Sequence, residues 1–246
     1  MSPSCLSSGF ELGRLGRSGQ GNHLLTGEGC VIAQGCRIAS QVGIAVGMAL
    51  LWGCAGTGEM VSLNVQPQQP FVQSGRPEPL KIVIEPFEDL RADTSKIGQR
   101  THLGGGVTNF NVSGGKPGVT IAEALAEALR QRGWNRRGWD ARVVQSGVAV
   151  SGADIIINGE IQEFAANAKS RVFNTKLTGQ SRLVIRAKNL ADDSSTQRNI
   201  QGQQTQTVFW FTGEDVENLM AGILKDGIDR FLTDTKIEDR SLKSIK

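Results

Sequence analysis

A short uncharged stretch divides this chain into two parts. Residues 42–53 read VGIAVGMALLWG, contain no charged side chain and end directly before Cys54. A helix that crosses a bilayer needs about 20 apolar residues, whereas the core of an export signal needs about 7 to 15 behind a positively charged segment. Arg14, Arg17 and Arg37 supply that positive segment. The pattern therefore predicts an export signal, followed by a body that folds without it. The alternative, a buried helix of the body, fits poorly with a run that contains glycines and has no polar face.

The cysteines agree with this division. Cys5, Cys30, Cys36 and Cys54 are the four cysteines of the chain, so none follows Ala55. Removal of residues 1–53 would leave one thiol at the new N-terminus and no internal disulfide. A cysteine-free body suits an oxidising compartment, although it does not require one.

The residues around Cys54 resemble the processing site of bacterial lipoprotein precursors. That site has an apolar residue, a small or aliphatic residue, a small residue and then cysteine. Leu51, Gly53 and Cys54 fit it, whereas Trp52 is bulkier than the pattern expects. The resemblance implies cleavage between Gly53 and Cys54, a diacylglycerol on the Cys54 thiol, and an N-acyl chain such as palmitate. The thiolate is the nucleophile that thioether formation needs. The alternative for Cys54 is an unmodified, buried thiol.

Composition predicts the domain boundaries. Residues 1–53 form a signal peptide whose N-terminus is over-extended, because a leading segment rich in Gly and Ser is unusually long; Val31 is a candidate for the true start. Residues 54–79 contain prolines and little hydrophobic pattern, which predicts a lipidated cysteine followed by a flexible tether. We expect a folded domain over residues 80–236 and a polar tail over residues 237–246.

The first half of the body carries strand signals and one helix signal. LKIVIEPFEDL, from Leu80, predicts a buried strand that leads into a loop, and GGG before the alternating residues 107–112 predicts a hairpin. TIAE is a capping-box pattern, so a helix is expected to begin at Thr120, with Glu123 bonding back, and to end at Gly133.

The second half predicts a meander of strands and a long helix. Residues 155–164, 170–177, 181–190 and 204–211 contain alternating or β-branched runs. Thr212 and Asp215 open a helix with apolar residues at three and four spacing: Val216, Leu219, Met220, Ile223, Leu224, Ile228, Phe231 and Leu232. The element order predicts an α+β fold, in which a mixed, mostly antiparallel sheet carries two helices on one face.

The body also resembles a family. The PFED loop, the GGG and GGKPG loops, a helix ending in RGW, the NGEI strand and the closing helix resemble the YajG-type lipoproteins of Gram-negative bacteria, over residues 80–235. The resemblance implies a lipid-anchored envelope protein without known enzymatic activity. In cells similar to enterobacteria, Ala55 rather than aspartate after Cys54 favours the outer membrane, on its periplasmic side.

Candidate catalytic groups are few. GGGVTNFNVSGGKPG is not a phosphate loop, because Pro117 follows Lys116 and lacks an N–H. His102 is expected to be a solvated loop residue. Carboxylates that cluster after the first strand could bind calcium or act as acid and base, which leaves a hydrolase as the alternative of another class; they are Glu85, Glu88, Asp89 and Asp93. We expect no metal and no cofactor besides the acyl chains.

The segment GWNRRGWD, residues 133–140, interleaves indoles with guanidinium groups. Trp and Arg are enriched in protein interfaces, so Trp134, Arg136, Arg137 and Trp139 are a candidate partner-binding surface. The alternative is one buried Trp beside a solvated turn.

The net charge of +3 is too small to indicate nucleic acid. We expect a non-enzymatic envelope lipoprotein that contacts an unidentified envelope protein, with no small-molecule substrate. A related alternative is an accessory subunit of an envelope transport or assembly system.

Overall fold

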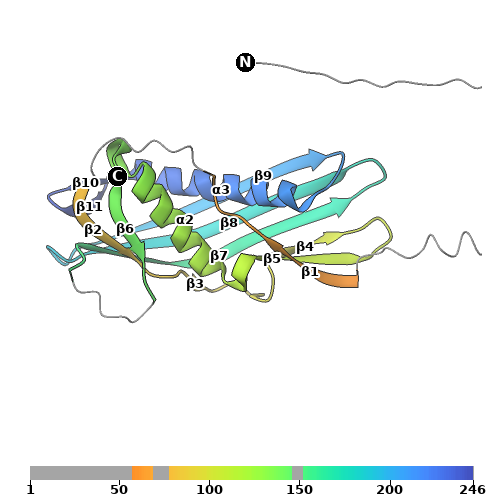
Figure 1. Cartoon of the computed structure of the whole chain (residues 1–246), viewed down its shortest axis with the longest axis horizontal. Helices are drawn as coiled ribbons and strands as arrows, with labels where there is room; N and C mark the ends of the chain where they lie inside the picture. Colours follow the sequence, from red (N-terminus) through yellow and green to blue (C-terminus); the bar gives the residue numbers. More distant parts are fainter. Residues whose placement is uncertain (1–56, 69–77, 146–151, 246) are drawn as a thin grey trace, which may run out of the picture. The chain divides into compact units, whose positions relative to one another are not determined.

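The computed structural model describes residues 57–68, 78–145 and 152–245. All of them belong to one of two compact units, Gly53–Lys246. The predictions for Gly53, Cys54 and Val31 fall outside the described residues. Figure 1 shows the described part as a long twisted sheet with helices on one side.

The sheet is built around one long strand, β7 (Ile155–Ser170). One edge of β7 pairs along its length with the antiparallel strand β8 (Thr175–Asn189), which pairs in turn with antiparallel β9 (Ser195–Val208). These three strands form a meander joined by short turns, as the alternating pattern of the second half predicts.

The other edge of β7 pairs with short strands that follow one another along it. They are β2 (Glu78–Ile84), β3 (Glu88–Asp89) and β4 (Gly98–Thr101), all parallel to β7. Beyond them, β5 (Val107–Val112) is antiparallel to β4, β1 (Thr57–Leu63) is parallel to β5, and β6 (Trp139–Val143) is parallel to β2. The sheet is therefore mixed, and its longest pairings are antiparallel.

Two helices cover one face of this sheet: α2 (Pro117–Gln131) packs on β6, and α3 (Gly213–Asp234) packs on β8 and β9. The helices also contact each other, and the predicted α+β fold is confirmed. Short 3₁₀ turns, η2 (Ser113–Gly115) and η3 (Trp134–Arg136), flank α2. None of the helices in the described part is long and apolar enough to cross a membrane.

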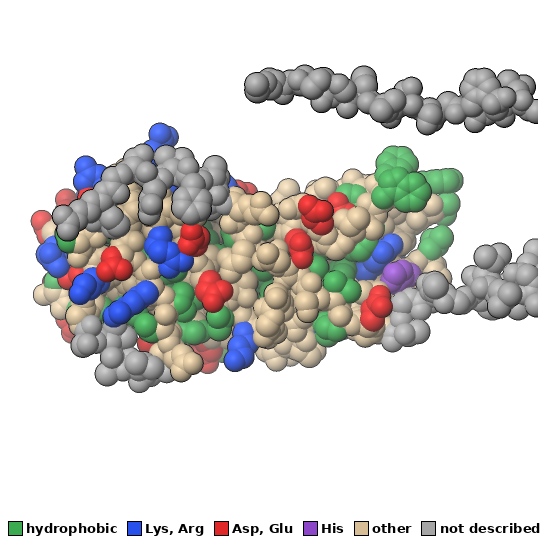
Figure 2. All heavy atoms as spheres, viewed as in Figure 1, with side chains coloured by type: hydrophobic (Ala, Val, Ile, Leu, Met, Phe, Trp, Pro, Cys, Tyr) green, Lys and Arg blue, Asp and Glu red, His purple; other side chains and the backbone are tan. Residues whose placement is uncertain are grey.

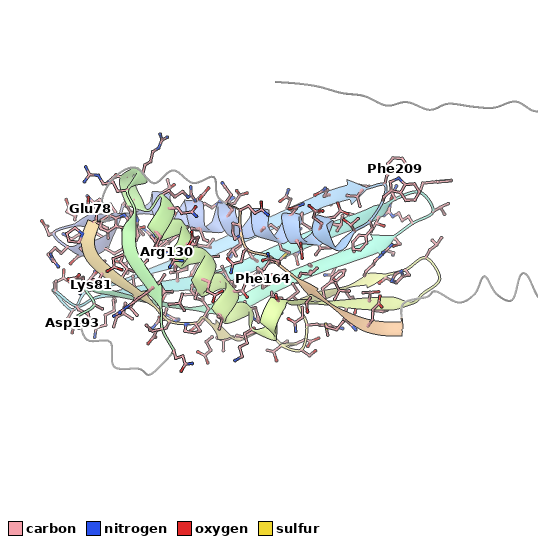
Figure 3. The ribbon with its side chains drawn as sticks, in the orientation of Figure 1. Glu78, Lys81, Arg130, Phe164, Asp193 and Phe209 are labelled. Atoms are coloured by element: carbon pink, nitrogen blue, oxygen red, sulfur yellow. The ribbon has the colours of Figure 1, made fainter. Side chains whose placement is uncertain are left out.

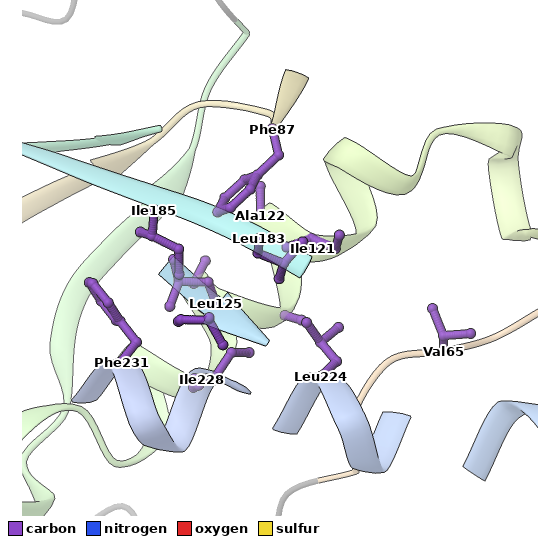
Figure 4. Close-up of a cluster of buried hydrophobic side chains, with 14 of the residues drawn as sticks. Val65, Phe87, Ile121, Ala122, Leu125, Leu183, Ile185, Leu224, Ile228 and Phe231 are labelled. Atoms are coloured by element: carbon purple, nitrogen blue, oxygen red, sulfur yellow. The ribbon is translucent and has the colours of Figure 1, made fainter. Parts of the chain in front are cut away.

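The core lies between the helices and the sheet. The apolar stripe predicted for α3 faces inward, where Leu224, Ile228 and Phe231 meet Leu183 and Ile185 of β8 (Figure 4). Thr212 and Asp215, which are predicted to open this helix, form a capping box. Gly179 of β8 lies directly under α3, where an added Cβ would be 2.5 Å from Ile223 Cδ1. The helix therefore sits close to the sheet because β8 has no side chain there.

Two local predictions are wrong. Helix α2 begins at Pro117 rather than Thr120, and Lys116 is its N-cap without a side-chain hydrogen bond. Proline suits the first helical turn, where its missing N–H would have no partner. Residues 170–177 are not a separate strand, because β7 continues to Ser170 and turns over residues 171–174 into β8.

The folded part extends beyond both predicted boundaries of the domain. Upstream of Leu80, in the predicted tether, β1 pairs with β5, and Leu63 and Val65 are buried. At the other end, the predicted polar tail contributes to a hairpin of β10 (Thr235–Glu238) and β11 (Ser241–Ser244), in which Leu242 is fully buried. The upstream segment does alternate, with Val61, Leu63 and Val65 facing inward, so its strand signal was present and was overlooked. The tail has only Ile237 and Leu242 as inward-facing apolar residues, too few for a periodic pattern.

Candidate functional site

The predicted partner-binding segment is mostly a packing element. Trp134 and Trp139 are buried and meet edge to face, with ring centroids 5.6 Å apart. The indole Nε1 of Trp134 donates a hydrogen bond to Thr235 Oγ1 at 2.9 Å, which joins η3 to the end of α3. Arg136 and Arg137 are exposed, and Arg137 pairs with Glu78 at 2.5 Å. The fold therefore leaves the two guanidinium groups, but neither indole, for a partner.

A groove of about 630 Å³ lies beside this segment, between the end of α2 and the second half of α3. Asp229 accepts from Lys225 at 2.9 Å and also pairs with Arg132 of the α2 end. The carboxylate thus ties the two helices together. Arg136 lines the groove as a further cation. The charges here have a clear structural role in joining α2 to α3.

The acidic residues after β2 are held in separate arrangements. Asp89 binds Arg91 through two bonds, of 2.7 and 2.8 Å, and Arg91 also donates to the carbonyl oxygens of Lys96 and Phe164. Asp93 accepts from the backbone N–H and hydroxyl of Ser95, and these bonds lower the pKa of the Asp93 carboxyl. The Asp89–Arg91 pair therefore organises the loop that leads from β3 to β4.

The other two carboxylates have weaker ties. Glu85 accepts from Asn158 at 3.4 Å, and Glu88 is exposed. Within the described residues, no three His, Cys, Asp or Glu side chains are grouped to hold a metal ion. His102 is half-buried, and its Nε2 lies 2.8 Å from Thr108 Oγ1, which in turn donates to Glu59 at 3.1 Å. His102 is thus part of a polar link between the β4–β5 turn and β1.

The most unusual surface is a cluster of exposed apolar side chains at one end of the sheet, which we name the apolar tip. Five large side chains with exposed fractions from 65% to 87% form it: Leu103, Val172, Phe173, Phe209 and Trp210. Full burial of a side chain of this kind is worth about 1.5–3 kcal/mol relative to exposure. Exposed apolar groups that cluster usually mark a surface that contacts a partner or a membrane.

The strand registers bring these residues together. Thr101 pairs with Lys169, so the β4–β5 turn with Leu103 lies beside the β7–β8 turn with Val172 and Phe173. Thr175 pairs with Val208, so Phe209 and Trp210 adjoin the same turn from the other side. Figure 2 shows apolar side chains gathered at this end, and Figure 3 places Phe209 there.

A compact base supports the apolar tip. The ring of Phe211 stacks on Phe110 at 6.2 Å, and the Arg100 guanidinium lies 4.1 Å from the centroid of Phe211. Arg100 Nε also donates to Ser170 Oγ at 3.0 Å, and burial lowers the pKa of the Arg100 guanidinium. The loops that carry the exposed rings are therefore fixed to β4, β5 and β7 from below.

Sequence reasoning missed this surface. The run QTQTVFWF was interpreted as a strand, and residues 170–177 as another, because aromatic and β-branched residues favour strands. The sequence does contain one sign of this surface: the apolar pairs Val172–Phe173 and Phe209–Trp210 lie at the ends of long strands that are rich in polar residues. Only the register shows that the three segments meet.

Comparisons with known proteins find only distant similarity to solved structures. No family model and no curated protein matches the chain. A DUF330 protein from Xanthomonas campestris is 9% identical, with a TM-score of 0.42 over 72% of this chain and 93% of its own. A homolog of the neuraminyllactose-binding hemagglutinin from Helicobacter pylori is 7% identical, with a TM-score of 0.39 over 68% and 91%. Lipoprotein GNA1162 from Neisseria meningitidis is 12% identical, with a TM-score of 0.30 over 60% and 97%. Such identities and scores assign neither a family nor a function to the chain.

Proposed function

We propose that this chain is a lipid-anchored lipoprotein of the bacterial envelope, held by acyl chains on Cys54, and that its body acts through protein contacts. The observation that supports this most is the position of the lipoprotein-like motif, residues 51–54, directly before the fold. Thr57 already belongs to β1, which pairs with β5. A lipid on Cys54 would thus be attached next to the folded body. Two or three acyl chains bind almost permanently, because each buried methylene contributes about 0.8 kcal/mol.

The geometry of the acidic loop supports a non-enzymatic role. A carboxylate that acts as acid or base has to reach a substrate with its own oxygen. Both oxygens of Asp89 instead accept from Arg91, and Asp93 accepts from Ser95. A hydrolase would have to rely on Glu85 or Glu88, which have weaker ties within the fold. If the alternative function holds, Glu85→Gln or Glu88→Gln should therefore abolish any hydrolysis that the purified protein shows.

The location and the partner form the finer part of the proposal. Ala55 after Cys54 favours the outer membrane, with the body facing the periplasm. The exposed guanidinium groups of Arg136 and Arg137 give a partner a basic contact, and an accessory subunit of a transport or assembly system would use such a contact. Arg136→Glu should then reduce co-purification of the partner without affecting the folded state.

The decisive experiment is intact mass with membrane fractionation of the protein from its native host. The expected species is in the membrane fraction, begins at Cys54 and carries the mass of the acyl chains. Cys54→Ala should lack that mass, whereas Cys36→Ala, which changes another cysteine of the leader, should behave like the wild type. A soluble, unacylated wild-type protein would overturn the proposal.

A further inference from the structure

The apolar tip and the exit of the chain toward Cys54 lie at the same end of the sheet. Thr57 pairs with Val107, the first residue after the turn that carries Leu103. Figure 1 shows the start of β1, in orange, beside the β4–β5 turn. The N-terminal end of β1 and the turn are therefore neighbours in space.

The chain between Cys54 and Thr57 is too short to separate the anchor from the apolar tip. Two residues, Ala55 and Gly56, separate them, so Thr57 is three residue steps from Cys54, and at about 3.6 Å per step an extended chain spans at most about 11 Å. Acyl chains on Cys54 would hold its sulfur at the headgroup level of a bilayer. Thr57, and with it this end of the sheet, is then within about 11 Å of that level.

The chemistry of the apolar tip matches a bilayer surface. Trp and Phe side chains are favoured at the boundary between headgroups and acyl chains, where an indole buries its ring and keeps its N–H in contact with water. Trp210 is the most exposed of the large apolar side chains, at 87%, and Phe209 and Phe173 follow. Arg100 and Phe211 fix these loops, so little ordering is needed on contact.

Basic side chains lie next to the apolar tip. Lys169 and Lys176 are directly opposite each other on β7 and β8, and both are exposed. Like charges in this position destabilise a sheet unless an anion offsets them. None of the ion pairs formed by the described residues includes these lysines or Arg171 of the adjoining turn. Anionic lipid headgroups would supply the missing charge.

The opposite end of the sheet has another composition. Its β8–β9 turn carries Asp192 and Asp193, and its β10–β11 turn carries Asp239 and Arg240. Asp193, Asp239 and Arg240 form ion pairs within the fold, such as Lys188 with Asp193 at 2.8 Å, and Asp192 accepts hydrogen bonds from Ser194 and Ser241. Figure 3 shows Asp193 and Phe209 at opposite ends. Leu190, at the end with Asp193, is 43% exposed, whereas the apolar side chains that are 65% or more exposed gather where the chain leaves toward Cys54.

We propose that the apolar tip inserts into the same bilayer that holds the acylated Cys54, with Lys169, Lys176 and Arg171 against anionic headgroups. The inference rests on the proposed anchor and adds a second membrane contact to it. Two contacts at one end fix the orientation of the body, which a single lipidated residue cannot do. The end of the sheet with Asp193 then points away from the membrane and is presented to the compartment.

Tryptophan fluorescence tests this insertion. In the processed protein, Trp134 and Trp139 are buried, so Trp210 is the indole that can meet lipid. The full protein, purified from its host, is reconstituted into vesicles of phosphatidylglycerol and phosphatidylcholine brominated on its acyl chains. The expected result is a blue shift of the Trp210 emission and its loss by bromine quenching. Trp210→Phe should remove the quenched component.

Matched variants connect the signal to the apolar tip. Leu103→Asp, in the tip, should reduce quenching of Trp210, whereas Leu190→Asp, an exposed leucine at the opposite end, should leave it unchanged. Unquenched Trp210 in protein that carries the acyl mass and floats with the vesicles would overturn the inference and leave the anchor intact. Emission that is already shifted without lipid, in a protein that sediments as a dimer, would also overturn it in favour of a second copy. If the intact mass shows no acyl chain on Cys54, the proposed anchor is wrong. Quenching of Trp210 by the brominated vesicles then tests the insertion of the apolar tip by itself.

Discussion

At the start of α2, Gly118 touches the backbone of the loop that follows β2. A Cβ at position 118 would lie 2.0 Å from the carbonyl oxygen of Phe87, while the Phe87 N–H donates to the Gly118 carbonyl at 3.2 Å. Phe87 itself is buried against Ala122, one turn further along the helix (Figure 4). The helix and the loop therefore meet at a distance that only glycine permits.

We predict that Gly118→Ala lowers the free energy of unfolding by about 2–4 kcal/mol, because the helix has to move away from the loop. Gly222→Ala in α3 is the control, since its Cβ would lie 3.5 Å from Gln204 Oε1 and meets no closer atom. There the ordinary preference of helices for alanine should raise the free energy by up to about 1 kcal/mol. Urea denaturation measures both. Equal effects of the two substitutions would contradict the proposed contact.

The tryptophans of GWNRRGWD illustrate what sequence can and cannot predict at this scale. The segment alternates Trp and Arg, which are both common at interfaces, so it was predicted to be a candidate partner-binding surface. The arginines are indeed on the surface. The partner of the Trp134 indole is Thr235, 101 residues away, so no local pattern reveals it. Gly133, two residues after the end of α2, has φ of +27°, and this turn directs the chain so that both rings enter the core.

At the scale of elements, the predictions that succeeded depend on neighbouring residues only. The apolar stripe of α3 and the start of this helix at Thr212 and Asp215 are local patterns, and both are confirmed. The hairpin of β4 and β5 is likewise confirmed by their antiparallel pairing. The ends of β7 and β8 were misjudged because residues 171–174 have strand-favouring side chains in a turn. The position of that turn depends on the pairing of β7 with β8 and with β4. These pairings are contacts between residues that are far apart in the sequence.

The two predicted helix caps allow a direct comparison. Thr212→Val should lower the free energy of unfolding by about 1–2 kcal/mol, because the hydroxyl and the Asp215 carboxylate form a true capping box. Thr120→Val should change it by about 0.5 kcal/mol or less, because Thr120 lies inside α2 and its hydroxyl only bonds back to Lys116 O at 3.3 Å. Thermal and urea unfolding measure both. A larger loss at Thr120 would restore the helix start expected from sequence.

Asp154 makes the stability of the sheet end depend on pH. Its carboxylate accepts from the Lys81 backbone N–H at 2.8 Å and from Arg240 at 2.6 Å, and these bonds lower the pKa of Asp154 below its usual value near 3.8. A lowered pKa stabilises the folded state above the unfolded pKa, and this contribution is lost as pH falls through the folded pKa. Acid titration of unfolding should therefore show a steeper loss below about pH 4 in the wild type than in Asp154→Asn. Parallel curves for the two proteins would show that the bonds are absent in solution.

At the scale of the whole molecule, β7 determines the arrangement. It pairs with β8 on one edge and with β2, β3 and β4 in succession on the other, so it connects both ends of the sheet. The length of β7 separates the apolar tip from the end that carries Asp193 (Figure 3). The overall α+β class was predictable from element order, but this polarity was not, because it depends on which turns share an end of the sheet.

In the run Phe209, Trp210 and Phe211, two side chains that are proposed to contact the membrane precede one that packs within the fold. Phe209 and Trp210 are 79% and 87% exposed, whereas Phe211 packs between Phe110 and the Arg100 guanidinium. Phe209→Ser and Trp210→Ser should therefore change the free energy of unfolding by about 0.5 kcal/mol or less. Phe211→Ser should lower it by about 2 kcal/mol or more, because it leaves a gap beneath a half-buried cation.

The same series tests the proposed orientation of the molecule on a membrane. With the acyl anchor intact, the Phe209→Ser protein should stay in the membrane fraction but lose its fixed orientation, since one lipidated residue allows rotation and two contacts do not. Protease access to the exposed loop at Arg171 reports this orientation, because insertion of the apolar tip shields that loop. Cleavage there should thus be slow in membrane-bound wild type and fast in Phe209→Ser, while detergent should equalise the two. Equal rates on membranes, with both proteins acylated, would mean that the anchor alone holds the body and that the apolar tip faces a protein.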